Sequence, residues 1–297
     1  MATPQVSENP EVQQNYLAGL ALGAAVAQTV EALWSATQPL ASAEAMARFA
    51  SGLFIVAGQF GGVAASVGED YYRAARREAG ITTTIKLPEP VLPTRAEIDA
   101  DIAWATRERA DLADDLDAMH AAILADMQAE TEKAVLDVMR TRVVQAVEGD
   151  DTALGFRRVP RPGACYWCIS LAIRSSTRGS DDRHYGVYKT RAAAGQLPAA
   201  ASELNRFHTN CHCEVEPVWS PATSIPDWLG DLETLYADST RESAKGESLN
   251  DFRKALTAHR NGEEFPAPTA PVSLPTSNPA AAQIAAILDR LAEATAA

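Results

Sequence analysis

The four cysteines of the chain lie in two short stretches whose residue types could bind a metal. "GACYWC" separates Cys165 and Cys168 by two residues, and "RFHTNCHC" places His208 shortly before Cys211 and Cys213. Two cysteines at this spacing can bind one ion from a single turn, and zinc prefers four thiolate or imidazole ligands in a tetrahedron. The pattern therefore predicts a structural zinc site that uses four of these five side chains.

The fourth ligand stays open at this point. Cys211 can complete the site with either Cys213 or His208, whereas His212 points away from its neighbours if this segment is extended, because side chains alternate along a strand. The two ligand groups are separated by 42 residues, from 169 to 210. Metal binding would therefore hold a sizeable segment, and its free energy would contribute directly to folding.

Reduced structural thiols are a second interpretation of the cysteines, and a redox or catalytic role is a third. A redox CxxC is expected to follow a strand and open a helix, but the approach "FRRVPRPGA" is interrupted by prolines and predicts neither. Catalysis by serine or cysteine needs a nucleophile, a base and an orienting acid. The residue types are present, without a motif that fixes their geometry, in Ser170, His184, His208, Asp181 and Asp182.

The charge distribution argues against some classes of function. A net charge of -13 argues against a free-standing protein that reads DNA sequence, because phosphate binding needs clustered Lys and Arg. Residues 153–215 are different: nine Lys or Arg against four Asp or Glu give +5, which leaves -18 for the remainder. This basic segment coincides with the cysteines, where metal-bound thiolates would leave negative charge to offset. It is also the one argument for a nucleic-acid-binding module.

No secretory signal follows Met1, so we expect a reducing compartment, which favours a metal site or thiols over disulfides. Residues 49–68 form a run of twenty residues without charge, long enough to span a membrane, and Gly58 and Gly62 make a GxxxG within it. Five glycines, two serines and Gln59 make the run poorly apolar. We therefore predict a buried helix of small residues and no stable membrane association.

The hydrophobic periodicity predicts a mainly α protein with a small α+β module. A helical hairpin is expected over 1–81, with Ser42 capping its second helix and one apolar face made by Leu17, Leu20, Ala24, Ala27, Val30 and Leu33. A Pro-rich spacer covers 82–93, and Thr94 and Glu97 then form a capping box that opens a long acidic helical region over 94–150.

The apolar stripe predicted along this long helix consists of Ile98, Ile102, Ala105, Leu112, Leu116, Met119 and Ile123. Between Arg95 and Glu132 the other face carries eleven acids and three bases. Such a face is either solvated or meets a basic partner.

The remaining chain divides by composition into four parts. The Cys/His module is expected over 151–220, with strand-like alternation in "YGVYK" and "CEVEPVW". A helical extension follows over 221–264, then a Pro-rich linker over 265–279. Residues 280–297 place Ile284, Ile287, Leu288 and Leu291 at helical spacing, which predicts a C-terminal helix that docks on this protein or on a partner.

Three segments together resemble the C-terminal module of MuF-like minor head proteins of tailed bacteriophages. They are "RVPRPGACYWCISLAIR", "GVYKT" and "FHTNCHCEVEPVW". Cys165 and Cys168 match the opening CxxC of that module, and His208, Cys211 and Cys213 match its closing motif. The resemblance covers roughly residues 150–220.

The resemblance implies a protein of the phage head, made in the host cytoplasm and carried in the virion in few copies near the portal. Its expected partners are the portal protein and other capsid proteins, with non-specific contact to packaged DNA, and its expected role is head assembly or DNA packaging and ejection. Related proteins of actinobacterial phages are often labelled capsid maturation proteases. Cleavage of head proteins is therefore the alternative function, although the residues themselves show no protease constellation.

Overall fold

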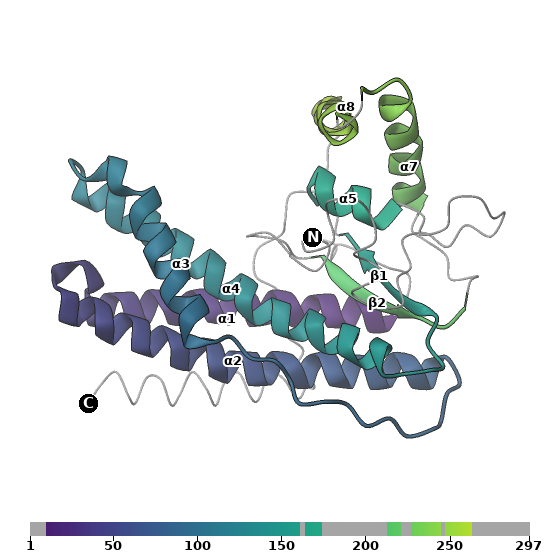
Figure 1. The fold of residues 1–297 in the computed structure, drawn as a ribbon, viewed down its shortest axis with the longest axis horizontal. Coiled ribbons are helices and arrows are strands. Elements are labelled where there is room, and N and C mark those ends of the chain that lie inside the picture. The colour runs from purple at the N-terminus through teal and green to yellow at the C-terminus, as the bar shows by residue number, and fades with distance from the viewer. Residues whose placement is uncertain (1–9, 161–163, 174–212, 221–226, 245–246, 263–297) are drawn as a thin grey trace.

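Three long helices lie side by side and form the body of the protein (Figure 1). They are α1 (Pro10–Thr37), α2 (Ala43–Glu78) and α4 (Leu116–Glu148). The computed structural model describes residues 10–160, 164–173, 213–220, 227–244 and 247–262. Within these, the smaller elements are α3 (Arg95–Glu108), β1 (Gly155–Val159), α5 (Tyr166–Ile173), β2 (Glu214–Val218), α7 (Asp227–Thr240) and α8 (Ser248–Gly262). The prediction of a mainly helical chain with a small α+β part is confirmed.

Helix α1 packs on the bundle through a different face from the predicted one. Its large buried side chains are Val12, Tyr16, Leu22, Val26, Val30 and Trp34. Of the face expected from the sequence only Val30 belongs to this set, and the other members are partly exposed. Since Ala and Leu are spread over several sides of this helix, the composition offers more than one apolar face, and packing against α2 and α4 selects between them.

Helix α2 begins and ends where the sequence indicates. The Ser42 hydroxyl accepts the amide of Ala45 at 3.1 Å, and Gly80, just past the C-terminus, has φ of +77°, a conformation that glycine adopts without strain. Phe49, Leu53 and Phe60 point into the core. By length and composition α1 and α2 could each cross a membrane, but half of each apolar window is buried inside this protein.

Helices α2 and α4 approach each other closely at Gly68. A Cβ added there would lie 2.5 Å from the carbonyl oxygen of Met139. This distance is shorter than any ordinary contact, so the two backbones can pack this closely only because Gly68 has no side chain.

The spacer that follows α2 is extended and runs along the bundle. Arg142 of α4 donates to the carbonyl of Pro88 and forms an ion pair with Glu69 of α2. Leu92 lies against Gly61 of α2. Helix α3 then opens with the predicted capping box between Thr94 and Glu97, which is confirmed.

The prediction of one long helix over 94–150 is wrong. Helix α3 ends at Glu108, a 3₁₀ turn spans Ala110–Leu112, and α4 starts after Asp115, whose carboxylate accepts the amide of Ala118 at 3.0 Å. A side chain that caps a new helix competes with continuation of the old one, which explains the break. Consequently Leu116 is exposed instead of continuing the apolar stripe. Helix α3 and the beginning of α4 form an arm that projects from the bundle (Figure 1).

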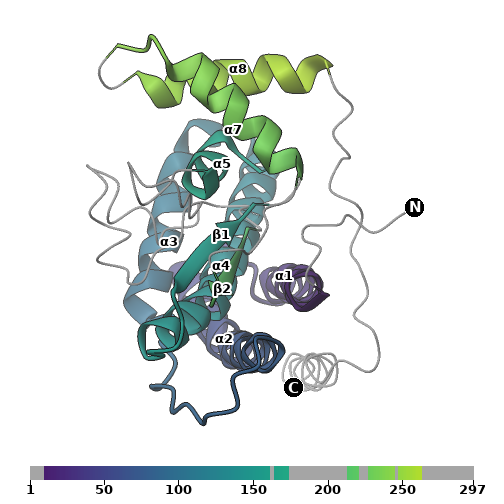
Figure 2. The same ribbon diagram turned by 90° about the vertical axis from the view of Figure 1, so that its right-hand side faces the viewer.

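Strands β1 and β2 pair antiparallel, with Arg157 opposite Glu216 and Val159 opposite Glu214. β2 was predicted from the sequence, but β1 was not. Every residue of both strands is buried. Figure 2 shows why: the sheet lies between the long helices and a second layer formed by α5, α7 and α8.

Helices α7 and α8 lie within the predicted helical extension over 221–264. The strand expected at "YGVYK", the linker over 265–279 and the C-terminal helix over 280–297 lie outside the described residues.

Candidate functional site

Cys165 and Cys168 lie at the start of helix α5. Cys165 immediately precedes the helix, and Cys168 is in its first turn. The backbone amide of Cys168 donates to the Sγ of Cys165, with 3.4 Å between the atoms. An amide that points at a sulfur stabilises negative charge on it, and the N-terminus of a helix adds to this effect. The local structure therefore favours thiolate character at Cys165.

Two arginines bring positive charge to the same pair of cysteines. Arg158 of β1 places Nη1 3.5 Å from the Sγ of Cys168, which is 0% exposed. Arg260 of α8 donates to the carbonyl of Ala164, the residue before Cys165. Burial lowers the pKa of Arg260, and the charge of Cys165 opposes that shift. Both cysteines thus lie in a positive environment that suits thiolates.

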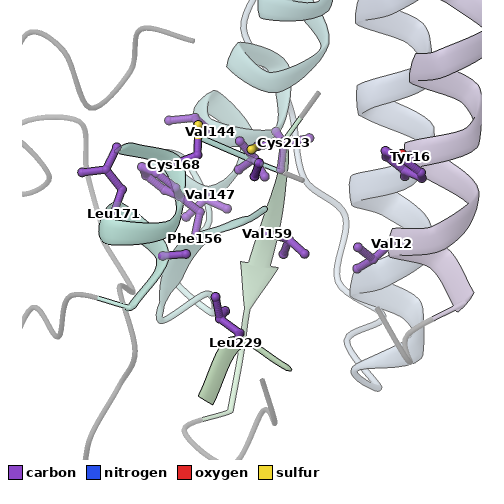
Figure 3. Close-up of a cluster of buried hydrophobic side chains, with 14 of the residues drawn as sticks. Val12, Tyr16, Val144, Val147, Phe156, Val159, Cys168, Leu171, Cys213 and Leu229 are labelled. Carbon is purple, nitrogen blue, oxygen red and sulfur yellow. The ribbon is translucent and has the colours of Figure 1, made fainter. Parts of the chain in front are cut away.

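Cys213 leads directly into strand β2 and is 1% exposed. Its carbonyl accepts a hydrogen bond of 2.9 Å from Nε of Arg140, a buried residue of α4 that also pairs with Asp137. Cys168 and Cys213 belong to one buried hydrophobic cluster together with Phe156, Val144 and Leu171 (Figure 3). Cys213 is therefore held to the bundle by α4, directly before the strand that pairs with the strand of Arg158.

The three cysteines that the structure describes are not joined by disulfides. Among the described residues, no group of three or more His, Cys, Asp or Glu side chains could hold a metal ion. Two of the five predicted ligands, His208 and Cys211, lie outside these residues. The paired sulfurs at the start of α5 have the donor chemistry of half a zinc site, and its other half would come from the segment that contains His208 and Cys211.

The structural context of the CxxC differs from the expectation in one respect. A strand, β1, does precede Cys165, and a helix does begin directly after it, although the sequence indicated neither. The sheet is antiparallel and has two strands, so the βαβ context of redox CxxC motifs is not formed by the described strands.

Comparison with known proteins decides the family. The model of the VG15 protein family matches residues 10–239, which is 230 of the 297 residues and includes the bundle, the sheet and both cysteine stretches. The chain belongs to the VG15 family. VG15 is a family of phage proteins, so this chain is a phage protein. No curated protein and no solved structure matches it.

In this VG15 protein, Ser170 is the candidate catalytic residue that the structure describes, and its hydroxyl makes a contact within its own helix. Ser170 is fully buried in α5, and its hydroxyl donates to the carbonyl of Trp167 at 2.8 Å. A hydroxyl held inside a helix in this way is not presented to a substrate. The other candidates, His184, His208, Asp181 and Asp182, lie outside the described residues.

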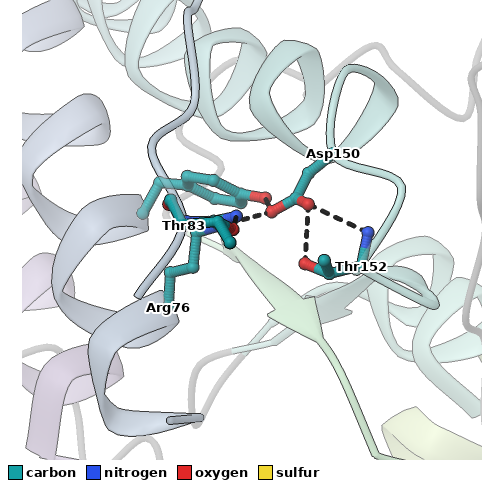
Figure 4. A network of polar contacts seen from close by, with 5 residues as sticks. Arg76, Thr83, Asp150 and Thr152 are labelled. Carbon is teal, nitrogen blue, oxygen red and sulfur yellow. Dashed lines mark hydrogen bonds and ion pairs between the residues drawn. The ribbon is translucent and has the colours of Figure 1, made fainter. Parts of the chain in front are cut away.

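A buried ionic network was not predicted from the sequence of this VG15 protein (Figure 4). The carboxylate of Asp150, just after α4, accepts the hydroxyl of Tyr72 at 2.7 Å and Nε of Arg76 at 2.7 Å. Thr152 donates to the same carboxylate through its amide and its hydroxyl. Arg76 also donates to Thr83 of the spacer. The network joins α2, the spacer and the approach to β1.

Burial by itself would raise the pKa of the Asp150 carboxyl, but hydrogen bonds from Arg76, Thr152 and Tyr72 outweigh it and hold the pKa well below its usual range. For Tyr72, burial raises the pKa of the phenol, and the hydrogen bond to Asp150 adds to the rise. Asp150 is therefore a carboxylate and Tyr72 a neutral donor throughout the physiological range.

A second set of buried polar side chains lies on the sheet face toward the bundle. Arg157 and Glu216, which are opposite each other across the strands, form an ion pair. Glu214 accepts Nδ2 of Asn15 on α1 at 2.7 Å. Burial raises the pKa of Glu216, and Arg157 opposes that rise. The signal available in the sequence was the alternation of Glu214 and Glu216 with apolar residues in "CEVEPV", together with charges of opposite sign in "FRRV".

Proposed function

We propose that this VG15 protein is a MuF-like minor head protein of a tailed phage. It acts within the virion near the portal, in head assembly or in DNA packaging and ejection. The observation that carries the proposal is that Cys168 of α5 and Cys213 directly before β2 belong to one buried cluster at a small sheet, which is covered by α5, α7 and α8 and attached to a helical bundle. Membership of a phage family over 10–239 supports the virion context, and the resemblance of both cysteine motifs supports the minor head assignment.

The arm formed by α3 and α4 is the part that we propose to contact the portal or a capsid protein. Its turn carries five exposed acids within ten residues, Glu108, Asp111, Asp114, Asp115 and Asp117. The arm projects from the bundle (Figure 1), so these charges are accessible to a partner. Concentrated acidic charge at an exposed tip favours a basic surface on that partner and speeds association with it.

The first test is the composition of the particle. Mass spectrometry of purified virions should detect the chain in few copies per head, and heads assembled without it should differ in DNA content or infectivity. Expression in infected cells together with absence from the virion would refute the proposal. Cleavage of capsid or scaffold protein by the purified chain would instead favour the capsid maturation protease.

The second test concerns the acidic arm. Replacing Asp111 and Asp114 with Lys reverses charge at the turn and leaves the Asp115 cap in place. Incorporation into heads should fall severalfold, because each reversal adds like-charge repulsion to a basic partner. The matched control changes two exposed acids of the other layer, Asp238 and Glu242, to Lys, and incorporation should stay as in the unchanged protein. Equal incorporation of both variants would exclude the arm as the contact.

We further propose that a structural zinc ion joins the two cysteine stretches. Cys165 and Cys168 supply two thiolates from the start of α5, and two of His208, Cys211 and Cys213 supply the others. When bound, zinc would hold its ligands in a fixed tetrahedron and so connect α5 to the approach to β2. Two contacts support this proposal: the backbone amide of Cys168 donates to the sulfur of Cys165, and the guanidinium of Arg158 lies against the sulfur of Cys168. Both stabilise the thiolates that zinc needs.

Metal analysis of the purified chain tests the zinc proposal, with one zinc per chain expected. Cobalt substituted for zinc should give thiolate charge-transfer absorption, which reports sulfur ligands directly. Cys168→Ser and Cys211→Ser should lose the metal, whereas His212→Ala, between two candidate ligands, should retain it. Comparing His208→Ala with Cys213→Ser identifies the fourth ligand. A chain that folds without metal and shows no cobalt–sulfur absorption would rule out the zinc site.

A further inference from the structure

The outward face of α2 is apolar, and two glycines without side chains lie near its middle. Opposite the core side of this helix, Ile55, Gly58, Gly62 and Ser66 follow one another at three- and four-residue steps, and Phe54 lies beside them. Ile55 is 51% exposed and Phe54 38%. A Cβ added at Gly58 or Gly62 would have no atom of the described residues within 4 Å. The two glycines therefore form a notch flanked by large apolar side chains.

This face also lacks the charge expected of a solvated surface. No charged residue occurs from Phe49 to Gly68, although 22% of the chain is charged, so about four charges would be expected in twenty residues. The core side of α2 accounts for part of this deficit, but its outward side normally carries polar and charged side chains. An uncharged outward side with exposed Ile and Phe is typical of a contact surface.

We propose that this face is the docking site of the protein's own C-terminal segment, residues 280–297. In a helix, Ile284, Ile287, Leu288 and Leu291 share one face, because they are spaced by three, four and seven residues. Asp289, Arg290 and Glu293 then lie on the opposite face. Such a helix has one apolar side that needs a partner and one polar side that suits water.

The two surfaces match in length and in shape. From Ile55 to Ser66 the outward face of α2 extends ~17 Å, and a helix from Ala280 to Leu291 also extends ~17 Å, at about 1.5 Å per residue. Glycines at the centre of one helix let a second helix approach closely, so branched Ile and Leu side chains can fill the notch. Alanines around the apolar side of the C-terminal segment keep that approach close.

The chain between α8 and the segment is a long tether. α8 ends at Gly262, and residues 263–279 contain five prolines among seventeen residues. Extended at ~3.1 Å per residue, this tether spans about 50 Å, close to the length of α2 itself. A covalent tether also gives the segment an effective concentration in the millimolar range. Docking within one molecule is therefore favoured over docking of a second copy.

Photo-crosslinking on the purified full-length chain tests the proposal. A benzophenone amino acid at position 55 or 62 should crosslink to residues 280–297 of the same molecule, identified by mass spectrometry in a product of monomer mass. The same probe at Asp114, an exposed residue in the turn between α3 and α4, should not reach that segment. Crosslinks in a product of dimer mass would replace this proposal with a second copy as the occupant. Crosslinks to added anionic phospholipid vesicles, with none to 280–297, would replace it with a membrane.

Matched variants of the segment separate docking from other effects. Ile284→Asp with Leu288→Asp places two charges on the apolar side, and the intramolecular crosslink should fall at least tenfold. Ala282→Asp with Ala286→Asp places the same two charges, also four residues apart, on the opposite side, and the crosslink should persist. Neither pair changes a residue of α1, α2 or α4, so circular dichroism should show unchanged folding of the long helices. An equal loss in both variants would overturn the proposal.

Discussion

The carboxylate of Asp150 is the most informative single group to perturb. It is buried and accepts four hydrogen bonds, from Tyr72, Arg76 and two donors of Thr152. These donors come from α2 and from the turn that leads from α4 to β1 (Figure 4). Removing the carboxylate leaves the guanidinium of Arg76 buried without its ion-pair partner, which is among the most costly changes a folded protein can undergo.

The size of the effect follows from the contacts. Loss of one member of a buried ion pair costs about 3–5 kcal/mol, so we expect Asp150→Ala to lower the free energy of unfolding by this amount. Tyr72→Phe removes one hydrogen bond to a charged group and keeps the ring, so its cost should be about 1.5–3 kcal/mol. The two losses should not add, because Tyr72 has no carboxylate to donate to once Asp150 is gone.

Urea unfolding followed by circular dichroism measures these differences. The control is Asp99→Ala, which breaks an exposed ion pair with Arg95 and should hardly change the midpoint. If Asp150→Ala costs no more than Asp99→Ala, or if Tyr72→Phe and Asp150→Ala are fully additive, the network does not hold the helices as described.

The same carboxylate predicts a dependence on pH. Its pKa in the folded protein is held below its value of about 3.9 in an unfolded chain. Its stabilising effect is therefore fully present above about pH 5 and is lost as the pH falls through and below the unfolded value. The difference in unfolding free energy between the unchanged protein and Asp150→Asn should be constant from pH 5 to 8 and should shrink below about pH 4. A difference that grows in acid would contradict this assignment.

Two further predictions concern single positions in the helices. For Asp101 on α3, burial and the nearby Glu130 raise the carboxyl pKa to about 6, so the folded state is disfavoured as the pH rises from about 4 to 6. Asp101→Asn should therefore increase the free energy of unfolding at pH 7 by up to about 1 kcal/mol after solvent screening, with no gain at pH 4, as pH-dependent urea unfolding would show. Gly68→Ala should lower stability by about 1–3 kcal/mol in the same assay, because its Cβ would meet the Met139 carbonyl. Gly230→Ala, in α7 with no described atom within 4 Å, should be neutral or stabilising, and equal losses at both glycines would argue against the close approach of α2 and α4.

Helix ends could be predicted from the sequence wherever a residue type favours a single local role, such as capping a helix. Ser42 and the Thr94–Glu97 pair cap helices, and Gly80 follows a helix end with positive φ, as their chemistry requires. Asp115 is the same kind of signal, but the apolar stripe on both sides of it suggested continuity. A capping side chain within a periodic pattern therefore has to be weighed as a break.

Features that depend on distant partners could not be read in this way. The core face of α1 is selected by packing, since its Ala-rich surface offers several choices. Strand β1 was hidden because Arg157 and Arg158 look like surface residues until Glu216 and Cys168 are known to lie against them. For the candidate site, the structure places Cys165 directly before α5 and Cys168 in its first turn. Whether they bind zinc with His208, Cys211 or Cys213 stays a prediction.

The register of the two strands has a consequence for which segments of this protein can vary in length during evolution. Because Val159 pairs with Glu214, the chain leaves the sheet and returns to it at the same end, so residues 160–213 form a closed excursion of 54 residues. Doubling the length of a flexible loop whose ends are fixed costs only about 0.6 kcal/mol in closure entropy. Insertions in the sequence between α5 and β2 are therefore compatible with the pairing of β1 and β2 and with the buried contacts of α5. The connection can thus be lengthened for a new contact while the bundle is inherited unchanged.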